Sequence, residues 1–225
     1  MTGPTRRLNA AAVLAAFVIA GCSATMHQPS SAGGDATRSP AAQAKADNGQ
    51  PAYTAADVKF MQGMIGHHAQ ALVMAAMAPT HGARSAVRIL AERIDVSQRD
   101  EIAFMQRWLG ERHQTVPDPT AKHDMGHMDD MPGMQMAGPL MPGMRTPEQM
   151  AQLDSARGAE FDRLFLTFMI QHHTGARTMV DQLFASPGAG QDIYIFRYAS
   201  DVSADQTTEI DRIHTMLAST QPNRP

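Results

Sequence analysis

The chain has 225 residues, of which 43% are hydrophobic, and a formal net charge of −3 at neutral pH. A weakly acidic chain offers no basic surface for nucleic acid, so DNA and RNA are not expected as partners. The single Cys, Cys22, excludes intramolecular disulfides and leaves no thiolate cluster for a metal.

Residues 1–21 have the features of a lipoprotein signal peptide. Two Arg at positions 6 and 7 precede an apolar run at 8–20, which is too short to span a bilayer as a stable helix. The run ends in VIAGC at 18–22, which resembles the lipobox of bacterial lipoproteins, with Cys22 as the lipidated first residue. The sequence therefore predicts an extracytoplasmic protein that is attached to the cell envelope through its lipid. An ordinary secretory signal is the alternative.

A flexible tether is expected at 22–52, where Ser, Ala, Gly, Pro and Gln predominate and cannot build a core. The folded domain is expected at 53–220. It should contain two helical hairpins, at 54–113 and 146–219, joined by a loop at 114–145 that is rich in Met and His.

Four long helices are predicted in this domain. The first runs from Thr54 to about residue 78 and starts with a capping-box pattern between Thr54 and Asp57. The second, at 85–110, has apolar residues at helical spacing. The third, at 146–185, begins with TPEQ, an N-cap followed by Pro at the first helical position. The fourth covers 192–219. The short connections within each pair predict antiparallel hairpins.

The two hairpins are internal repeats. The segment 60–74 (FMQGMIGHHAQALVM) returns at an offset of 105 residues as 165–179 (FLTFMIQHHTGARTM), with seven of the fifteen positions identical. On the helix that follows, Gln-x-x-Glu-Ile at 98–102 recurs at 206–210. The whole hairpin is therefore duplicated.

The repeated positions carry imidazole and thioether groups in a fixed arrangement. On a helix, Met64 lies three residues before His67 and four before His68, so it neighbours both. Met169 has the same relation to the His pair at 172–173. The two His of a pair point about 100° apart, which predicts different roles. The alternative is an apolar stripe in which Met fills gaps and His finds a hydrogen-bond partner.

The loop at 114–145 holds the second concentration of Met. Three Pro-containing breaks exclude a core helix, and solvated Met is prone to oxidation without contributing to packing. We interpret the loop as an auxiliary metal-binding arm of lower affinity. Its candidate ligands are His123, Met125, His127, Met128, Met131, Met134, Met136, Met141 and Met144.

Met and His together favour Cu(I), because the thioether is a soft ligand and imidazole also binds copper. Calcium and magnesium prefer oxygen ligands, and structural zinc prefers Cys or more His. The sequence contains no Gly-rich phosphate loop, no Gly-x-Ser-x-Gly and no His-Glu-x-x-His. We therefore predict no catalytic residues and do not expect an enzyme.

The doubled pattern Phe-x-x-x-Met-Ile-x-His-His-x-x-Ala-x-x-Met, with Gln-x-x-Glu-Ile on the next helix, resembles the family called domain of unknown function 305. That family includes copper-binding envelope proteins of the CopM type. The resemblance covers residues 55–219 and implies a ferritin-like four-helix bundle that binds copper and contributes to copper tolerance. Leu166 replaces the Met expected opposite Met61, so the second copy has fewer thioethers. The metal ligands implied by position are Met61, Met64, His67, His68, Met74, Met169, His172, His173 and Met179.

The sequence thus predicts an all-α four-helix bundle that binds Cu(I) outside the cytoplasm and buffers, sequesters or delivers it. The expected partners are the copper ion and another copper-handling protein of the envelope. Two alternatives remain open: a metal-dependent oxidoreductase such as a cuprous oxidase, and an interaction module that binds metal incidentally.

Overall fold

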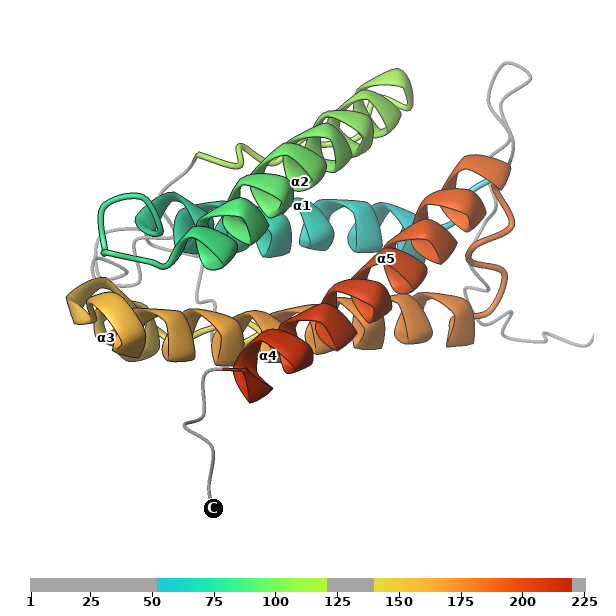
Figure 1. Ribbon diagram of the computed structural model, residues 1–225. Coiled ribbons are helices and arrows are strands. Elements are labelled where there is room, and N and C mark those ends of the chain that lie inside the picture. The colour runs from blue at the N-terminus through green and yellow to red at the C-terminus, as the bar shows by residue number, and fades with distance from the viewer. Residues whose placement is uncertain (1–51, 121–139, 220–225) are drawn as a thin grey trace, which may run out of the picture. The chain divides into compact units, whose positions relative to one another are not determined.

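The structure, a computed structural model, describes residues 52–120 and 140–219, and these ranges contain helices and no β-strand. Cys22, the signal peptide and nearly all of the tether lie outside them. The helices pack as two hairpins, α1 with α2 and α4 with α5, which meet through α1 and α4 (Figure 1). The prediction of an all-α fold is confirmed. The elements are α1 (Ala55–Met77), α2 (Ser85–Glu111), α3 (Pro147–Ser155), α4 (Gly158–Ala185) and α5 (Ile193–Ala218).

A buried Asp near the start of α1 and of α4 ties each hairpin to the other. Asp57 completes a capping box with Thr54 and accepts a hydrogen bond from the backbone N–H of Gly190, after α4, at 2.8 Å. Asp162 accepts from the backbone N–H of Arg84, before α2, at 3.3 and 3.4 Å. The two hairpins exchange equivalent contacts, so α1 and α4 lie antiparallel with their repeated segments facing each other.

The third predicted helix is interrupted. We expected one helix at 146–185, but the backbone at Ala156 and Arg157 is extended and separates α3 from α4. Gly158 then adopts φ +59°, a conformation that L-residues avoid, and its N–H donates to the carbonyl of His81 at 2.9 Å. The prediction of a continuous helix is therefore wrong. The hydrogen bond from Gly158 to the turn of the first hairpin interrupts it, and α4 begins there as a separate helix.

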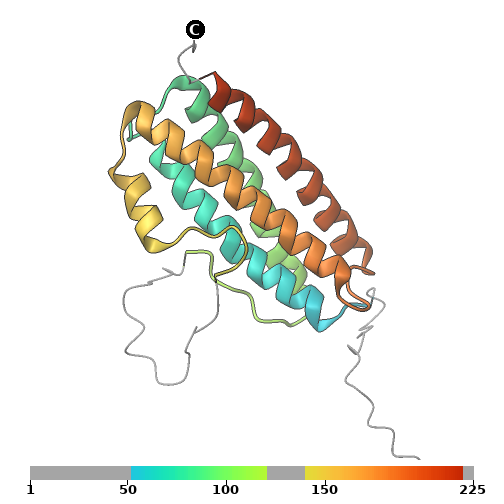
Figure 2. The same cartoon turned by 90° about the horizontal axis from the view of Figure 1, so that it is seen from below.

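Residues 141–145, which we call the strap, cross the seam between α1 and α4 (Figure 2). Gln70 on α1 accepts from the backbone N–H of Arg145 at 2.7 Å and donates to its carbonyl at 2.9 Å. On α4, a Cβ added to Gly175 would lie 2.1 Å from the carbonyl oxygen of Pro142. Only glycine allows the backbone of the strap to approach α4 this closely.

The bundle core consists of two groups of buried side chains, and both include Met. Burying one such side chain contributes about 1.5–3 kcal/mol, so these thioethers stabilise the fold whatever else they do. None of the helices in the described ranges combines the length and apolarity needed to cross a membrane. The first core group contains Met61, Met64, Met105 and Met179, and the second contains Met74 and Met169.

Candidate metal centre

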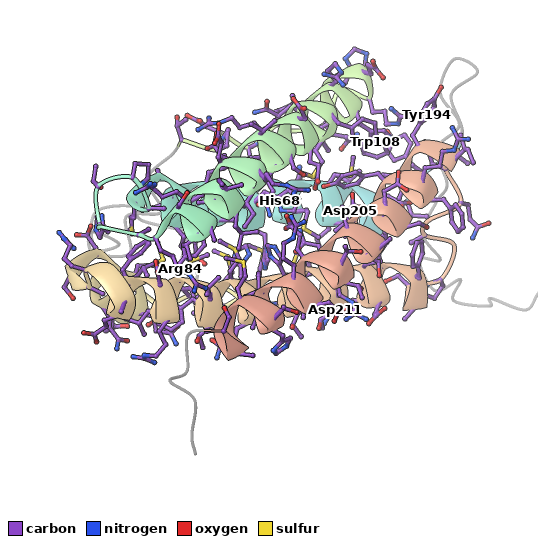
Figure 3. All side chains as sticks on the ribbon, in the orientation of Figure 1. His68, Arg84, Trp108, Tyr194, Asp205 and Asp211 are labelled. Carbon is purple, nitrogen blue, oxygen red and sulfur yellow. The ribbon has the colours of Figure 1, made fainter. Side chains whose placement is uncertain are left out.

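Four His side chains are buried where α1 meets α4. His67, His68, His172 and His173 are each at most 1% exposed, and His68 lies in the interior of the bundle in Figure 3. The ring centroids of His67 and His172 are 3.8 Å apart. Within each consecutive pair the ring centroids are 6.4 and 6.3 Å apart. His67 and His172, which we call the inner pair, are therefore the close contact between the two repeats.

Each of the other two His, the outer pair, is held by a Glu of the neighbouring helix. Nε2 of His68 lies 2.6 Å from Oε2 of Glu101 on α2, and Nε2 of His173 lies 2.7 Å from Oε2 of Glu209 on α5. Within the described ranges, Nδ1 of both rings is buried without a hydrogen-bond partner. A neutral imidazole that donates its N–H to a carboxylate has a lone pair on its other nitrogen, and metal-ligating His residues are commonly held in this way.

Glu101 and Glu209 had no predicted role, although both belong to the repeated Gln-x-x-Glu-Ile. That repetition was the available signal. Burial alone would raise the pKa of the Glu101 carboxyl, but the hydrogen bond and charge of His68 outweigh it, so the pKa lies below its ordinary value. Glu101 is therefore an ionised acceptor for the His68 ring.

The inner pair is held more loosely. Nε2 of His67 donates to the carbonyl oxygen of Pro142 in the strap at 3.0 Å. Among the described residues, Nδ1 of His67 and both ring nitrogens of His172 have no hydrogen-bond partner. An unsatisfied buried polar group costs about 1–3 kcal/mol. The inner pair thus lowers the stability of the metal-free bundle and offers lone pairs to a ligand.

Both inner rings are neutral. Burial, followed by the charge of His68, lowers the pKa of His67 from 6.5 to about 3. Burial, followed by repulsion from the charge that a protonated His67 would carry, also places the pKa of His172 well below its ordinary value. A His must be unprotonated to bind a metal, and at neutral pH these two rings meet that requirement.

The Met residues predicted as ligands are distributed over both core groups. Met64 and Met169 lie about one helical turn before His67 and His172, respectively, so each shares the helix face of an inner ring. In the described part of the chain, no group of three or more His, Cys, Asp or Glu side chains is arranged to hold a metal ion. A metal at the inner pair would therefore need thioether ligands as well.

The two ends of the centre differ. Tyr198 Oη lies 3.4 Å from Nε2 of His68 and donates to Sδ of Met105 at 3.3 Å. Burial and the charge of Glu101 raise the pKa of Tyr198 well above its ordinary value, so the phenol keeps its proton. The repeat places Leu90 and Ile213 at the positions of Tyr198 and Met105. Both are buried apolar residues of the second core group, so the second copy lacks this phenol and thioether.

Two of the predicted loop ligands lie in the described residues. Met141 is partly buried against the first core group, and Met144 is also partly buried. We expected both to belong to a mobile arm, but they lie in the strap on the bundle. The other predicted loop ligands fall outside the described residues: His123, Met125, His127, Met128, Met131, Met134 and Met136.

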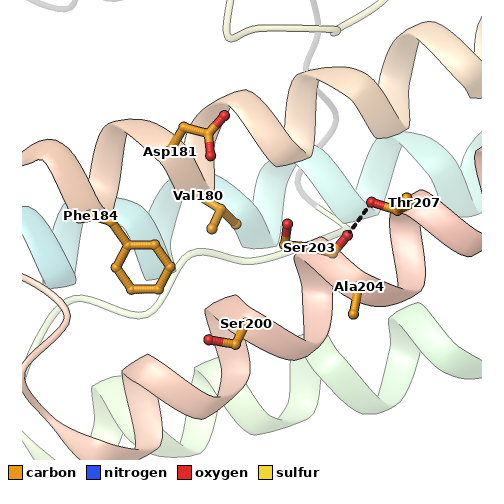
Figure 4. Close-up of a pocket in the computed structure, with 7 residues that line it drawn as sticks. All are labelled: Val180, Asp181, Phe184, Ser200, Ser203, Ala204 and Thr207. Atoms are coloured by element: carbon orange, nitrogen blue, oxygen red, sulfur yellow. Dashed lines mark hydrogen bonds between the residues drawn. The ribbon is translucent and has the colours of Figure 1, made fainter.

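A surface pocket between α4 and α5 is separate from these residues (Figure 4). Its lining includes Asp181, Phe184, Ser203 and Thr207, and Thr207 donates to the carbonyl of Ser203 at 2.7 Å. The described lining contains neither His nor Met, so the pocket offers no soft metal ligand.

Glu101 and Glu209 fix the outer rings, whose centroids lie 6.4 and 6.3 Å from those of the inner pair. Replacing both with Gln is therefore expected to weaken copper binding at the inner pair indirectly, by roughly tenfold, the lower end of the effect of losing a group around a metal site. An amide can still hydrogen-bond the imidazole but cannot hold it with a negative charge. The affinity would be measured by competition with a Cu(I) chelator. The control is Glu92→Gln, at an exposed Glu of α2. An unchanged affinity in the double variant would show that Glu101 and Glu209 do not contribute to copper binding.

The fold and the centre define a helical bundle of two homologous hairpins, with a cluster of buried His and Met side chains between them. The chain belongs to the family described as domain of unknown function (DUF305), whose model matches residues 57–217. The resemblance inferred from the sequence is thereby confirmed. A search of curated proteins finds no significant match.

Solved structures of the same family are similar to this chain. A DUF305 protein from Streptomyces coelicolor, named as a candidate secreted protein, is 25% identical and matches 76% of this chain and 96% of its own, with a TM-score of 0.60. A DUF305 fragment from Deinococcus radiodurans is 28% identical over 74% and 98%, with a TM-score of 0.59. CopM in its Cu(II)-bound form is 25% identical over 73% and 97%, with a TM-score of 0.55.

Proposed function

We propose that this protein binds Cu(I) outside the cytoplasm, at the inner His pair, and buffers it or delivers it to another protein of the envelope. The observation that carries the proposal is the contact of His67 and His172, two neutral buried imidazoles whose ring centroids are 3.8 Å apart. The similarity to CopM, a protein with a copper-bound structure, supports the choice of metal.

The ligand chemistry favours the monovalent ion. Two imidazoles and the thioethers of Met64 and Met169 form an uncharged set that includes soft sulfur, which suits Cu(I). Calcium and magnesium would require oxygen ligands. Thioethers carry no proton at neutral pH, so protons compete with the ion only at the imidazole nitrogens.

We propose binding and transfer, without turnover. Two imidazoles and two thioethers would fill the coordination of one ion, whereas a catalytic metal keeps a position open for substrate. The inner pair is also shielded from solvent, since neither ring is more than 1% exposed. Oxygen consumption by the Cu(I)-loaded protein would instead favour the cuprous oxidase alternative.

The test is an anaerobic Cu(I) titration, against a competing chelator, of a soluble form that lacks residues 1–22. The wild type is expected to retain one ion more tightly than the rest. The double variant His67→Leu, His172→Leu should lose that ion, while His214→Gln, at an exposed His of α5, should keep it. Equal affinity in a folded double variant would refute the inner pair as the site.

We also propose that the loop supplies ions of lower affinity, because its Gly- and Pro-rich sequence predicts no regular structure, and fixing such a segment around a metal costs entropy. Deleting residues 122–139 and bridging the gap with a Gly/Ser linker is expected to reduce the number of Cu(I) ions bound. The strap is retained, so the tightest ion should remain. Loss of the tightest ion from a folded deletion variant would make the loop the primary site.

The proposed anchor is the lipid on Cys22. Substituting Cys22→Ser is expected to release the protein from the membrane fraction or to leave its signal peptide uncleaved, because Ser provides no thiol for lipidation. Fractionation and mass spectrometry of the N-terminus would measure this. A cleaved Cys22→Ser protein that remained in the membrane fraction would contradict the lipoprotein proposal.

A further inference from the structure

The inner pair is buried, so an ion must first bind at a more accessible position. The segment of α1 just before His67 contains such a position. Gly63 lies four residues, about one helical turn, before His67 and therefore on the same face of the helix. Because glycine has no side chain, it leaves a notch in that face of α1.

Two thioether side chains converge over this notch. A Cβ added to Gly63 would lie 3.4 Å from Sδ of Met141 in the strap and 3.5 Å from Cε of Met179 on α4. Both side chains thus approach the same position on α1, although they come from different segments. The next residue of the strap, Pro142, accepts the hydrogen bond from Nε2 of His67 at 3.0 Å.

Exposure decreases along these residues. Met141 is partly exposed, Met179 is 8% exposed and His67 is fully buried. The exposed fraction therefore falls from the thioether of Met141 through that of Met179 to the imidazole of His67.

The repeat lacks this arrangement in its second copy. The position equivalent to Gly63 is Phe168, and the position equivalent to Met179 is Met74. Phe168 is itself buried, with the guanidinium of Arg145 over its ring at 5.6 Å. The aromatic ring fills the space that Gly63 leaves open. Met74 is fully buried in the second core group, so it provides a matched control.

We propose that Met141 and Met179 form a loading site for a soft monovalent cation, Cu(I), which then passes to the inner His pair. Two neutral thioethers bind a soft ion without releasing a proton. Transfer is ligand exchange: the bonds from copper to the two sulfur atoms break as bonds to imidazole nitrogen form, and the oxidation state does not change. The destination of the ion rests on the proposed function, but binding by the thioether pair does not.

Binding can be tested with Ag(I), a soft monovalent ion without redox chemistry, in the soluble form lacking residues 1–22, which contains no thiol. Met would be labelled with 13C in the methyl group and followed by NMR during a silver titration. The methyl signals of Met141 and Met179 are expected to shift together, at the same ratio of Ag(I) to protein. The methyl signal of Met74 should not shift with them. Independent movement of the two signals, or an equal response of Met74, would overturn the proposal.

Transfer can be tested by stopped-flow measurement of Cu(I) passing from a coloured chelator to the protein. Met141→Leu and Gly63→Phe, which reproduces the second copy, are each expected to slow loading roughly tenfold, equivalent to about 1.4 kcal/mol in the barrier. Met216→Leu, at a partly buried Met of α5 that is not among the predicted ligands, should load at the wild-type rate. Unchanged rates in both Met141→Leu and Gly63→Phe would overturn the proposal.

The double variant His67→Leu, His172→Leu separates this inference from the proposed function. With the inner pair removed, the Met141 and Met179 signals should still shift with silver. If they do, and wild-type protein nevertheless shows no tight Cu(I) site, the proposed function fails and the thioether site stands. If their shift disappears in the folded double variant, the thioether pair is not an independent site.

Discussion

His172→Leu is expected to stabilise the metal-free protein and to remove its tightest Cu(I) site. Both ring nitrogens of His172 are buried without hydrogen-bond partners in the described part of the chain. Leu has a similar volume and no polar atom. The free energy of unfolding of the variant should therefore exceed that of the wild type by about 1–2 kcal/mol. Chemical denaturation of the metal-free protein would measure the gain, and chelator competition would measure the loss of copper.

The control is the neighbouring residue of the same pair. His173→Leu also replaces a buried imidazole, but it removes the partner of Glu209, whose carboxylate lies 2.7 Å from Nε2 of His173. Leaving that group without its partner should destabilise the bundle. If His172→Leu destabilised the protein as much as His173→Leu, the His172 ring would be a structural group and not one kept for a metal.

The second large effect is a loss of stability in acid. Burial first, and then the other His residues, hold the pKa of His67 near 3 and that of His172 well below its ordinary value. In the unfolded chain both rings take up protons near 6.5, so the unfolded state binds more protons as the pH falls. The free energy of unfolding should therefore decrease below about pH 6.5, by up to about 1.4 kcal/mol per pH unit for each ring.

The measurement is the free energy of unfolding of the metal-free protein between pH 7 and about pH 5, above the range in which Asp and Glu side chains take up most of their protons. The double variant His67→Leu, His172→Leu removes both titrating rings and should have a much flatter profile. Equal slopes in the two proteins would show that the inner rings take up protons in the folded state as readily as in the unfolded chain.

Local sequence patterns were sufficient to predict where most of the helices start, and they indicated a Met and His ligand set. The capping box of Thr54 and Asp57 and the TPEQ segment at 146–149 both start helices in the structure, because capping depends on residues within one turn. The duplicated His pairs indicated metal binding, because repetition at a fixed offset preserved the same imidazole and thioether groups. These signals are contained in short stretches of chain.

Contacts between distant segments decided the rest. The carboxylates of Glu101 and Glu209 reach the outer His rings only when each hairpin is folded, and α4 starts anew at Gly158 because the turn of the other hairpin accepts its N–H. His67 and His172 face each other because α1 and α4 pack antiparallel. Helical periodicity specifies which face of a helix a residue occupies. It does not specify which other helix that face meets, because that depends on packing the whole core.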